Sequence, residues 1–341
     1  MSGGGAAGTR QMAVPTSREG TPAVEAIHLS KRYEDVQAVR DVSFSVPRGE
    51  VFAFLGPNGA GKSTTIKMLC TLARPSGGQA RVAGFDVQRQ PKAVRRRIGL
   101  VFQEQTLDQQ LTAEENLRFH AVLYGIPREL VGPRIDRVLE LVALTERRSD
   151  LVSKYSGGMA RRLEIARGML HTPTVLFLDE PTLGLDPQTR ALMWQDVLRM
   201  RAEEGVTVFL TTHYMDEAEY ADRIAIIDYG RIVALDAPDN LKALVGSDSV
   251  ELQTADDDRA AEALRKADLR VERTVDGILV FVPDGEAQVA RLIGIAAVPV
   301  HKVHVHRPTL DDVFLHFTGR EIREQGPAGP SAMVRAWGAR R

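Results

Sequence analysis

The sequence predicts an α/β protein with a mostly parallel sheet and, towards its C-terminal end, a smaller α+β domain. Apolar runs typical of strands alternate with helical patterns up to residue 227, and such alternation indicates a parallel sheet covered by helices. The run Val51–Leu55 is apolar throughout and precedes a glycine-rich loop, which indicates a central strand buried on both faces. Residues 248–318 follow a different order, β-α-β-β-α-β, which is typical of a ferredoxin-like unit.

Length and composition limit the classes of protein that the chain can represent. Its 341 residues allow two domains of about 150 residues each. The 44 basic and 45 acidic residues give a net charge of −1, without the basic excess typical of nucleic-acid-binding proteins. The single cysteine, Cys70, excludes an internal disulfide, and we expect it to be a core residue. No apolar run reaches the roughly 18–20 residues of a membrane span, and no secretory signal is recognisable, so we predict a cytoplasmic chain.

Changes in composition along the chain predict four segments. Residues 1–22 are rich in glycine and lack periodicity, which predicts a disordered tail. We expect the main domain at 23–246, with a helical subdomain at about 104–170, and an accessory domain at 247–318. Residues 319–341 read as a flexible tail whose five arginines and two glutamates give +3, so contact with an anionic membrane surface is a further hypothesis.

Periodicity places the individual elements. Alternating valine and phenylalanine side chains predict a half-buried strand at 42–46, and helical spacing of apolar residues predicts a helical insertion at 104–154. In the main domain we expect further strands at 51–55, 98–102, 174–178, 206–210 and 223–227, and helices at 62–72, 160–170, 187–204 and 214–221. In the accessory domain we expect strands at 249–254, 269–275, 277–282 and 299–306, helices at 256–267, 284–294 and 308–317, and a hairpin turn at Asp276-Gly277.

A glycine-rich loop between the strand at 51–55 and the following helix carries the most specific motif. The pattern G-x-x-x-x-G-K-[ST] is met by Gly56, Pro57, Asn58, Gly59, Ala60, Gly61, Lys62 and Ser63, followed by Thr64. Backbone N–H groups of such a loop, together with the helix N-terminus, bind phosphate oxygens. We expect Lys62 to bridge the β- and γ-phosphates of a nucleotide and Ser63 to bind Mg²⁺.

Two carboxylates end the apolar strand at 174–178. Asp179 is placed to hold the Mg²⁺ shell, and Glu180, one residue further, points elsewhere and can act as a general base on the attacking water. An isolated acidic pair at a strand end would more often belong to an ordinary loop. Together with the phosphate loop, the pair predicts a nucleotide-hydrolysing site.

Between these motifs the sequence resembles the ATP-binding subunits of ABC transporters. Tyr155-Ser156-Gly157-Gly158-Met159 is similar to the family signature LSGGQ, with Tyr155 and Met159 departing from it. The resemblance implies that Ser156, Gly157 and Gly158 bind phosphate. It also implies a P-loop NTPase core with an antiparallel β subdomain and an inserted helical subdomain.

Four more residues occur in the order that this family shows. Gln103 resembles the glutamine that senses Mg²⁺ and water and couples to a membrane partner. Asp186 resembles the aspartate of the D-loop, His213 the switch histidine at the γ-phosphate, and Tyr33 the aromatic residue that stacks on adenine. The resemblance covers about residues 23–245, and it implies that Glu180, His213 and Gln103 are catalytic.

The phrases Ser63–Ile66, Tyr155–Met159 and Arg307–Leu315 resemble the daunorubicin-resistance type of these ATPases. The resemblance implies an ATPase that powers export of a hydrophobic drug, antibiotic or lipid-like compound. It further implies pairing with a second copy of the chain, because the signature of one subunit closes over the ATP of the other. The partner in the membrane would be a separate permease of about six spans, each of about 20 residues, which holds the ATPase at the cytoplasmic face.

Three alternatives remain open. A soluble ABC ATPase acting on ribosomes or DNA fits less well, because the chain has one ATP module, Ser63 and Ser156 are only 93 positions apart, and the body is acidic. A nucleotide-switched module without catalysis is disfavoured by Glu180 and His213. Export of a polysaccharide or lipid by a related permease is not distinguished from drug export.

A metal site in the accessory domain is a weaker hypothesis. His304 and His306 would share one face of a strand that also carries His301. Because that strand offers no cysteine or acidic ligand, the sequence does not favour a metal centre there.

Overall fold

The computed structural model describes residues 20–274 and 277–319. The chain divides into two compact units, Met1–Pro238 and Asp239–Arg341. This division falls after the first residue of the helix Pro238–Val245, whereas the sequence analysis put the boundary after residue 246. The predictions of tails at 1–22 and 319–341 lie almost entirely outside the described residues.

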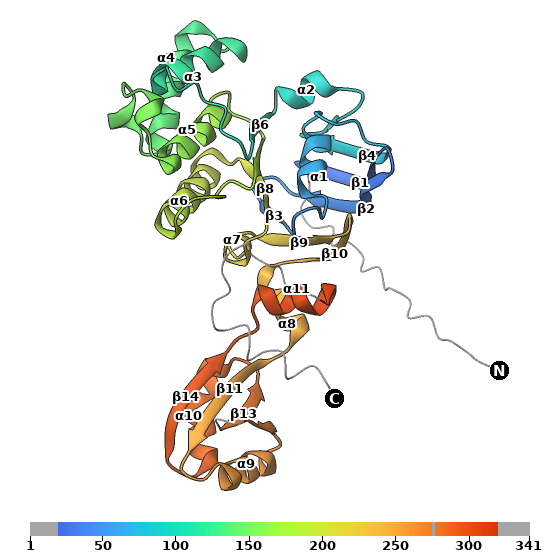
Figure 1. The fold of residues 1–341 in the computed structure, drawn as a ribbon, viewed down its shortest axis with the longest axis vertical. Coiled ribbons are helices and arrows are strands. Elements are labelled where there is room, and N and C mark those ends of the chain that lie inside the picture. The colour runs from blue at the N-terminus through green and yellow to red at the C-terminus, as the bar shows by residue number, and fades with distance from the viewer. Residues whose placement is uncertain (1–19, 275–276, 320–341) are drawn as a thin grey trace, which may run out of the picture. The chain divides into compact units, whose positions relative to one another are not determined.

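The first unit is built on one sheet of ten strands, in the order β5-β4-β1-β2-β10-β9-β3-β8-β7-β6 (Figure 1). The strands are β1 Val24–Tyr33, β2 Val36–Val46, β3 Val51–Leu55, β4 Gly77–Val82, β5 Phe85–Asp86, β6 Ile98–Val101, β7 Val175–Asp179, β8 Thr207–Thr212, β9 Arg223–Asp228 and β10 Arg231–Asp236. The five strands from β9 to β6 are parallel, and β3 and β7 are buried at every position, as their apolar runs predict.

An antiparallel subdomain continues the sheet beyond β9. Strands β1, β2, β4 and β5 pair antiparallel with one another, and β10 pairs antiparallel with β9. The two halves meet where β10 contacts β2 through a single parallel pair, Arg231 with Asp41. The predicted class, a mostly parallel sheet with an antiparallel subdomain, is confirmed.

The helices of the first unit are α1 Lys62–Leu69, α2 Pro91–Arg95, α3 Ala113–Leu123, α4 Arg128–Leu141, α5 Gly157–Met169, α6 Pro187–Glu204 and α7 Met215–Ala218. Helices α3, α4 and α5 form one lobe, which packs on β6 through α5 and lies away from α1 (Figure 1). The sequence analysis expected helices from residue 104, but α3 begins only at Ala113, where Thr112 forms a capping box with Glu115. Residues 103–112 are therefore a connecting loop.

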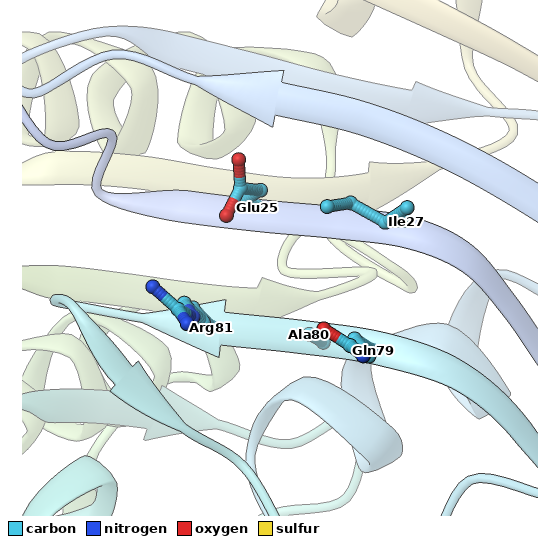
Figure 2. Close-up of a pocket in the computed structure, with 5 residues that line it drawn as sticks. All are labelled: Glu25, Ile27, Gln79, Ala80 and Arg81. Atoms are coloured by element: carbon cyan, nitrogen blue, oxygen red, sulfur yellow. The ribbon is translucent and has the colours of Figure 1, made fainter.

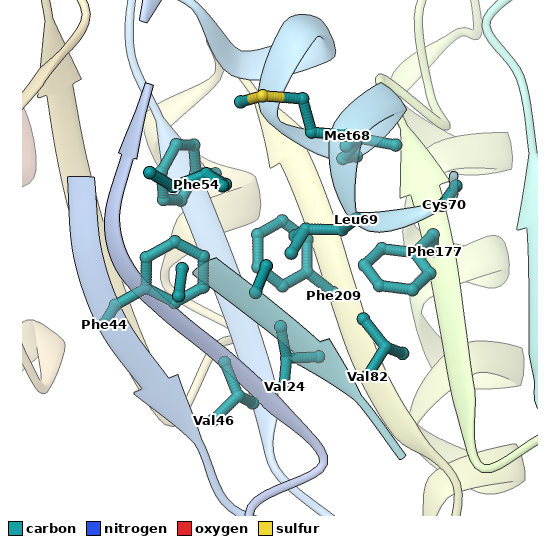
Figure 3. Packing of buried hydrophobic residues seen from close by; sticks show 14 of the residues in the cluster. Val24, Phe44, Val46, Phe54, Met68, Leu69, Cys70, Val82, Phe177 and Phe209 are labelled. Atoms are coloured by element: carbon teal, nitrogen blue, oxygen red, sulfur yellow. The ribbon is translucent and has the colours of Figure 1, made fainter. Parts of the chain in front are cut away.

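Aromatic side chains from neighbouring strands form the centre of the core. The rings of Phe44, Phe52, Phe54 and Phe209 lie 5.4–6.3 Å apart in pairs, and Phe177 packs on Phe209 (Figure 3). These residues come from β2, β3, β7 and β8, so the cluster fixes the parallel strands against the antiparallel subdomain.

The lone cysteine belongs to this core. Cys70 directly follows α1 and is 1% exposed, as the sequence predicts. Burial raises the pKa of its thiol, so it is an unreactive apolar side chain here.

The second unit has the predicted ferredoxin-like topology. Its strands are β11 Asp248–Thr254, β12 Arg270–Arg273, β13 Ile278–Val282 and β14 Val300–His306, and its helices are α8 Pro238–Val245, α9 Asp257–Lys266, α10 Gly285–Ala296 and α11 Leu310–Thr318. The sheet order is β12-β13-β11-β14, and all neighbours are antiparallel. Asp276 of the predicted hairpin turn lies outside the described residues.

Helix α11 carries the apolar stripe expected from the sequence. Leu310, Val313 and Phe314 are buried, and Phe317 is half-buried.

In the described part of the chain, no helix combines the length and apolar character that crossing a bilayer requires. Over the same residues, no group of three or more His, Cys, Asp or Glu side chains is arranged to bind a metal ion. His304 and His306 do share a face of β14, with their ring centres 5.5 Å apart, and His306 lies 3.5 Å from Glu251 on β11.

Candidate functional site

The phosphate loop connects β3 to α1 and depends on glycine at its two ends. A Cβ atom at Gly56 would lie 2.3 Å from the carbonyl oxygen of Ile227, and one at Gly61 would lie 2.6 Å from that of Ala38. Gly61 also has φ +109°, which L side chains rarely adopt. The loop can therefore pack against β2 and β9 only with glycine at these positions.

Lys62 is the first residue of α1, and its ammonium group is held inside the loop. It is 4% exposed and donates hydrogen bonds to the carbonyl oxygens of Gly56, at 2.7 Å, and Pro57, at 3.1 Å. Its Nζ atom lies 3.2 Å from Oε1 of Glu180. Burial lowers the pKa of Lys62, and the carboxylates of Glu180 and Asp179 oppose that shift.

Asp179 ends β7 and faces the hydroxyl of Ser63. Ser63 Oγ donates to Asp179 Oδ1 at 3.0 Å, and Thr211 Oγ1 on β8 donates to the same oxygen at 2.6 Å. Hydroxyl and carboxylate oxygens are the ligands that Mg²⁺ prefers, so this pair fits the ion that the sequence predicts. Thr211, which fixes the carboxylate, is a site residue that the sequence analysis missed.

Glu180 turns away from Asp179 because its backbone is in the left-handed region, with φ +46°. This conformation directs its side chain to Lys62 and to His213, whose Nδ1 atom lies 3.5 Å from Glu180 Oε2. His213, and after it Lys62, lower the pKa of Glu180, although burial raises it. Glu180 is thus held as a carboxylate, the form that can accept a proton.

The structure brings Lys62, Ser63, Asp179, Glu180 and His213 together. They come from the ends of β3, β7 and β8, which are parallel neighbours, so their carboxyl ends meet at one edge of the sheet. Such an edge is the usual ligand site of open α/β sheets.

The signature residues lie elsewhere. Ser156 and Gly157 are exposed at the start of α5, where the Ser156 hydroxyl accepts from Met159 N–H at 3.2 Å. A Cβ atom at Gly158 would lie 2.1 Å from Thr189 on α6, so this glycine allows the two helices to approach. Helix α5 belongs to the lobe that stands apart from α1 (Figure 1). One chain therefore does not close its own signature over its own phosphate loop.

Asp186 is a neighbour of the signature. It caps α6 by accepting from Thr189 N–H at 3.0 Å and from the Thr189 hydroxyl at 2.6 Å. Because Thr189 also packs against Gly158, Asp186 lies beside the signature, and Asp186, Ser156 and Gly157 are exposed.

Two further predicted residues are exposed and stand outside the polar cluster. Gln103 lies in the loop after β6 and takes part in none of the hydrogen bonds described above. Tyr33 ends β1, is 43% exposed, and has Lys31 Nζ 4.6 Å from its ring centre. Its hairpin with β2 passes beside the phosphate loop, because Ala38 contacts Gly61.

Another buried carboxylate, Glu217 on α7, was not found by sequence analysis. It is 1% exposed and accepts hydrogen bonds from the hydroxyls of Thr182 and Thr212, the latter at 2.6 Å. Arg190 Nε lies 3.7 Å away. Thr182 follows Glu180 by two residues and Thr212 precedes His213, so Glu217 joins the two loops that carry those side chains.

Glu217 makes stability depend on pH. Burial raises its pKa from 4.5 to about 7, the nearby Asp216 adds to this, and Thr212, Arg190 and His213 oppose it. Between these two values the unfolded chain is deprotonated at Glu217 and the folded chain is not, so stability falls as pH rises, by about 1.4 kcal/mol per unit. We therefore expect Glu217→Gln to gain stability relative to the parent between pH 5 and pH 7, measured by urea unfolding. An unfolding free-energy difference that is constant over this range would contradict the assignment.

A shallow hollow on β1 and β4 is a different feature. It is lined by Glu25, Ile27, Gln79, Ala80 and Arg81 (Figure 2). None of these residues belongs to the cluster around Lys62, so the hollow is not part of the nucleotide site.

The fold and the cluster define a class of protein, a P-loop NTPase in which the phosphate loop after β3 faces two acids at the end of β7, with β8 between these two strands. Comparison with known proteins narrows the class. Residues 39–183 match the family model described as ABC transporter. Daunorubicin resistance ATP-binding protein DrrA2 of Streptomyces coeruleorubidus is 43% identical over 307 residues, covering 87% of this chain and 95% of the relative.

Two further relatives support the same family. Nod factor export ATP-binding protein I of Burkholderia thailandensis is 40% identical over 299 residues, covering 87% of this chain and 97% of the relative. A solved structure, a dimeric post-hydrolysis state of an ATP-binding cassette bound to ADP and Pi, is 26% identical with a TM-score of 0.57, covering 63% of this chain and 98% of that one. The chain belongs to the ATP-binding subunits of ABC transporters, and it is an ATPase. The predicted membership of this family is confirmed.

Proposed function

We propose that this ATPase powers export of a hydrophobic drug, antibiotic or lipid-like compound through a separate membrane permease. The observation that carries the proposal is the convergence of Lys62, Asp179, Glu180 and His213 at one edge of the sheet. The name of the relative with 43% identity over most of its length, a daunorubicin resistance protein, supports a drug as cargo.

ATP would bind with its phosphates in the loop Gly56–Thr64, where Lys62 exchanges the carbonyl oxygens of Gly56 and Pro57 for phosphate oxygens. Ser63 and Asp179, with Gln103 after a movement of its loop, would hold Mg²⁺, which neutralises charge on the phosphates. Tyr33 would stack on the adenine.

Two copies of the chain would form the complete site. Ser156 and Gly157 of one copy are exposed at a helix N-terminus and, with the buried Gly158, would bind the phosphates held by the other copy, with Asp186 beside them. The related cassette solved as a dimer supports this arrangement.

Hydrolysis would use Glu180 as the general base. Its carboxylate accepts a proton from water as the water oxygen bonds to the γ-phosphorus and the bond to the ADP oxygen breaks, which leaves ADP and phosphate. His213 would contact the γ-phosphate and keep Glu180 oriented. The permease, of about six spans of roughly 20 residues each, would hold the ATPase at the cytoplasmic face of the membrane.

Export of a lipid or polysaccharide is a second candidate, because a relative named for Nod factor export matches this chain at 40% identity. Relatives named for different cargoes thus match about equally well, as expected if the permease selects the cargo.

The proposal is tested by expressing the chain in drug-sensitive cells, together with a candidate membrane permease, and measuring daunorubicin accumulation. We expect the parent chain to lower accumulation and Glu180→Gln to leave it unchanged. Equal accumulation in both strains would contradict drug export, and release of a lipid or saccharide by the parent alone would favour the second candidate.

A further inference from the structure

A buried group of charged residues on α5 lies outside the cluster around Lys62. Arg161, Glu164 and Arg167 follow one another at intervals of three residues, so they share a face of the helix. They are 4%, 0% and 7% exposed. Arg161 Nη1 lies 2.9 Å from Glu164 Oε2, and Arg167 Nη2 lies 3.8 Å from Glu164 Oε1. Charged side chains are this deeply buried only when they are paired and hydrogen-bonded.

The guanidinium of Arg161 binds the backbone at the ends of two strands. Its Nε donates to the carbonyl oxygen of Pro181 at 2.6 Å, and its Nη2 lies 3.4 and 3.3 Å from those of Asp179 and Glu180. Its Nη1 donates to the carbonyl oxygen of Phe102, directly after β6. One side chain therefore connects the end of β7 with the end of β6.

The loop that carries Gln103 is fixed at both ends by this group. Phe102 is held by Arg161, and Thr106 donates to Glu164 Oε1 through its N–H, at 2.7 Å, and its hydroxyl, at 3.1 Å. Arg167 adds bonds to Thr106 O, at 3.2 Å, and to its Oγ1 atom, at 2.6 Å. The residues between these anchors, Gln103 to Gln105, are exposed.

The contacts to β7 matter because Glu180 has an unfavourable backbone. A φ of +46° is strained for a non-glycine residue, and it persists only where the surroundings hold it. On one side, Thr211 Oγ1 accepts from Glu180 N–H at 3.1 Å. On the other side, Arg161 binds the carbonyl oxygens of Asp179, Glu180 and Pro181.

We propose that Arg161 is a positioning residue, which holds the backbone turn that aims Glu180 and ties that turn to the loop of Gln103. A displacement of the loop then changes the position of Glu180 through the Arg161 guanidinium, and bound nucleotide is not needed to connect the two. The inference rests on the proposed role of Glu180 as general base.

Lysine at position 161 cannot make the same set of contacts to carbonyl oxygens as arginine. Arginine has five donors in a planar fork, whereas lysine has one ammonium group that cannot reach both strand ends. Arg161→Lys keeps the positive charge beside Glu164, so it removes the carbonyl contacts without leaving that carboxylate unpaired.

The test compares ATP binding and steady-state turnover of the full-length chain with those of Arg161→Lys. We expect kcat to fall about 10- to 100-fold, as for a small misplacement of a reacting group, and the dissociation constant of ATP to change less than about threefold. Arg223→Lys is the matched control. Arg223 also binds a carboxylate, Glu50, and a carbonyl oxygen, that of Ser45, but it begins β9, at the opposite edge of the sheet. We expect it to retain parental kcat.

A double variant separates positioning from general damage. If Arg161 acts through Glu180, Arg161→Lys added to Glu180→Gln lowers single-turnover hydrolysis no further. A further loss, or parental kcat in Arg161→Lys, overturns the inference. Parental turnover in Glu180→Gln alone would instead overturn the proposed general base.

If the lysine variant does not fold, Glu164→Gln takes its place, because it removes the carboxylate that orients Arg161. We expect this variant also to lower kcat while ATP binding is kept. If kcat and ATP binding do not separate in this way, the inference is overturned.

Discussion

Glu180→Gln is expected to lower ATP hydrolysis by about 10²- to 10⁴-fold while ATP binding is retained. Glutamine has nearly the same shape, so it can remain beside Lys62 and His213, but it cannot accept the proton of the attacking water. Without hydrolysis, the dimer closed around ATP should accumulate. Size-exclusion chromatography with Mg-ATP would show a dimer for the variant under conditions in which the parent chain returns to monomer.

Glu50→Gln provides the control for this result. Glu50 is also a buried carboxylate, 8% exposed and paired with an arginine, but it precedes β3 and so lies at the other end of that strand from the phosphate loop. We expect it to keep parental kcat. Near-parental turnover in Glu180→Gln would remove Glu180 from the role of base.

Lys62→Met is expected to weaken ATP binding by about 10²-fold, because the charged hydrogen bonds that lysine donates to phosphate are lost. Removal of the buried ammonium group also leaves Glu180 without its lysine partner, 3.2 Å away, and frees the carbonyl oxygens of Gly56 and Pro57. We therefore expect a loss of about 3 kcal/mol in unfolding free energy. Isothermal titration calorimetry and urea unfolding measure the two effects.

Lys67→Met is a matched control on the same helix, since Lys67 is exposed one turn further along α1. Its ATP affinity and stability should equal those of the parent. Unchanged ATP affinity in Lys62→Met would contradict the placement of phosphate in the loop.

The elements with strong local signals could be predicted from the sequence. Val51–Leu55 is apolar throughout and is β3, and the topology of the second unit followed from the order of its strands and helices. The strand β10 was missed, because its six residues are all exposed or half-buried and it is joined to β2 by only one pair. The helical insertion was predicted to start too early, since the loop before Thr112 has no glycine or proline to mark it.

The residues of the candidate site, too, could be predicted only where a local sequence motif marks them. Motif spacing found Lys62, Asp179 and Glu180, but the ion pair between Lys62 and Glu180 joins residues 118 positions apart and has no local pattern. Arg161 and Glu217 were missed because charged residues are usually exposed, and their burial depends on carbonyl and hydroxyl partners from other strands. A usable signal was present for Arg161, because its neighbours on the same helix face, Gly158, Ile165 and Gly168, are apolar.

The ion pair of Lys62 with Glu180 makes the site a competition between two anions for one cation. The internal anion is the carboxylate, at 3.2 Å from the ammonium group, and the external one is the phosphate of the nucleotide. The affinity for ATP then depends on the difference between the Lys62–phosphate interaction and the Lys62–Glu180 interaction, rather than on the first alone. Glu180→Gln, which takes the internal competitor away, should bind ATP more tightly than the parent, so the residue that limits affinity is the one that makes turnover possible.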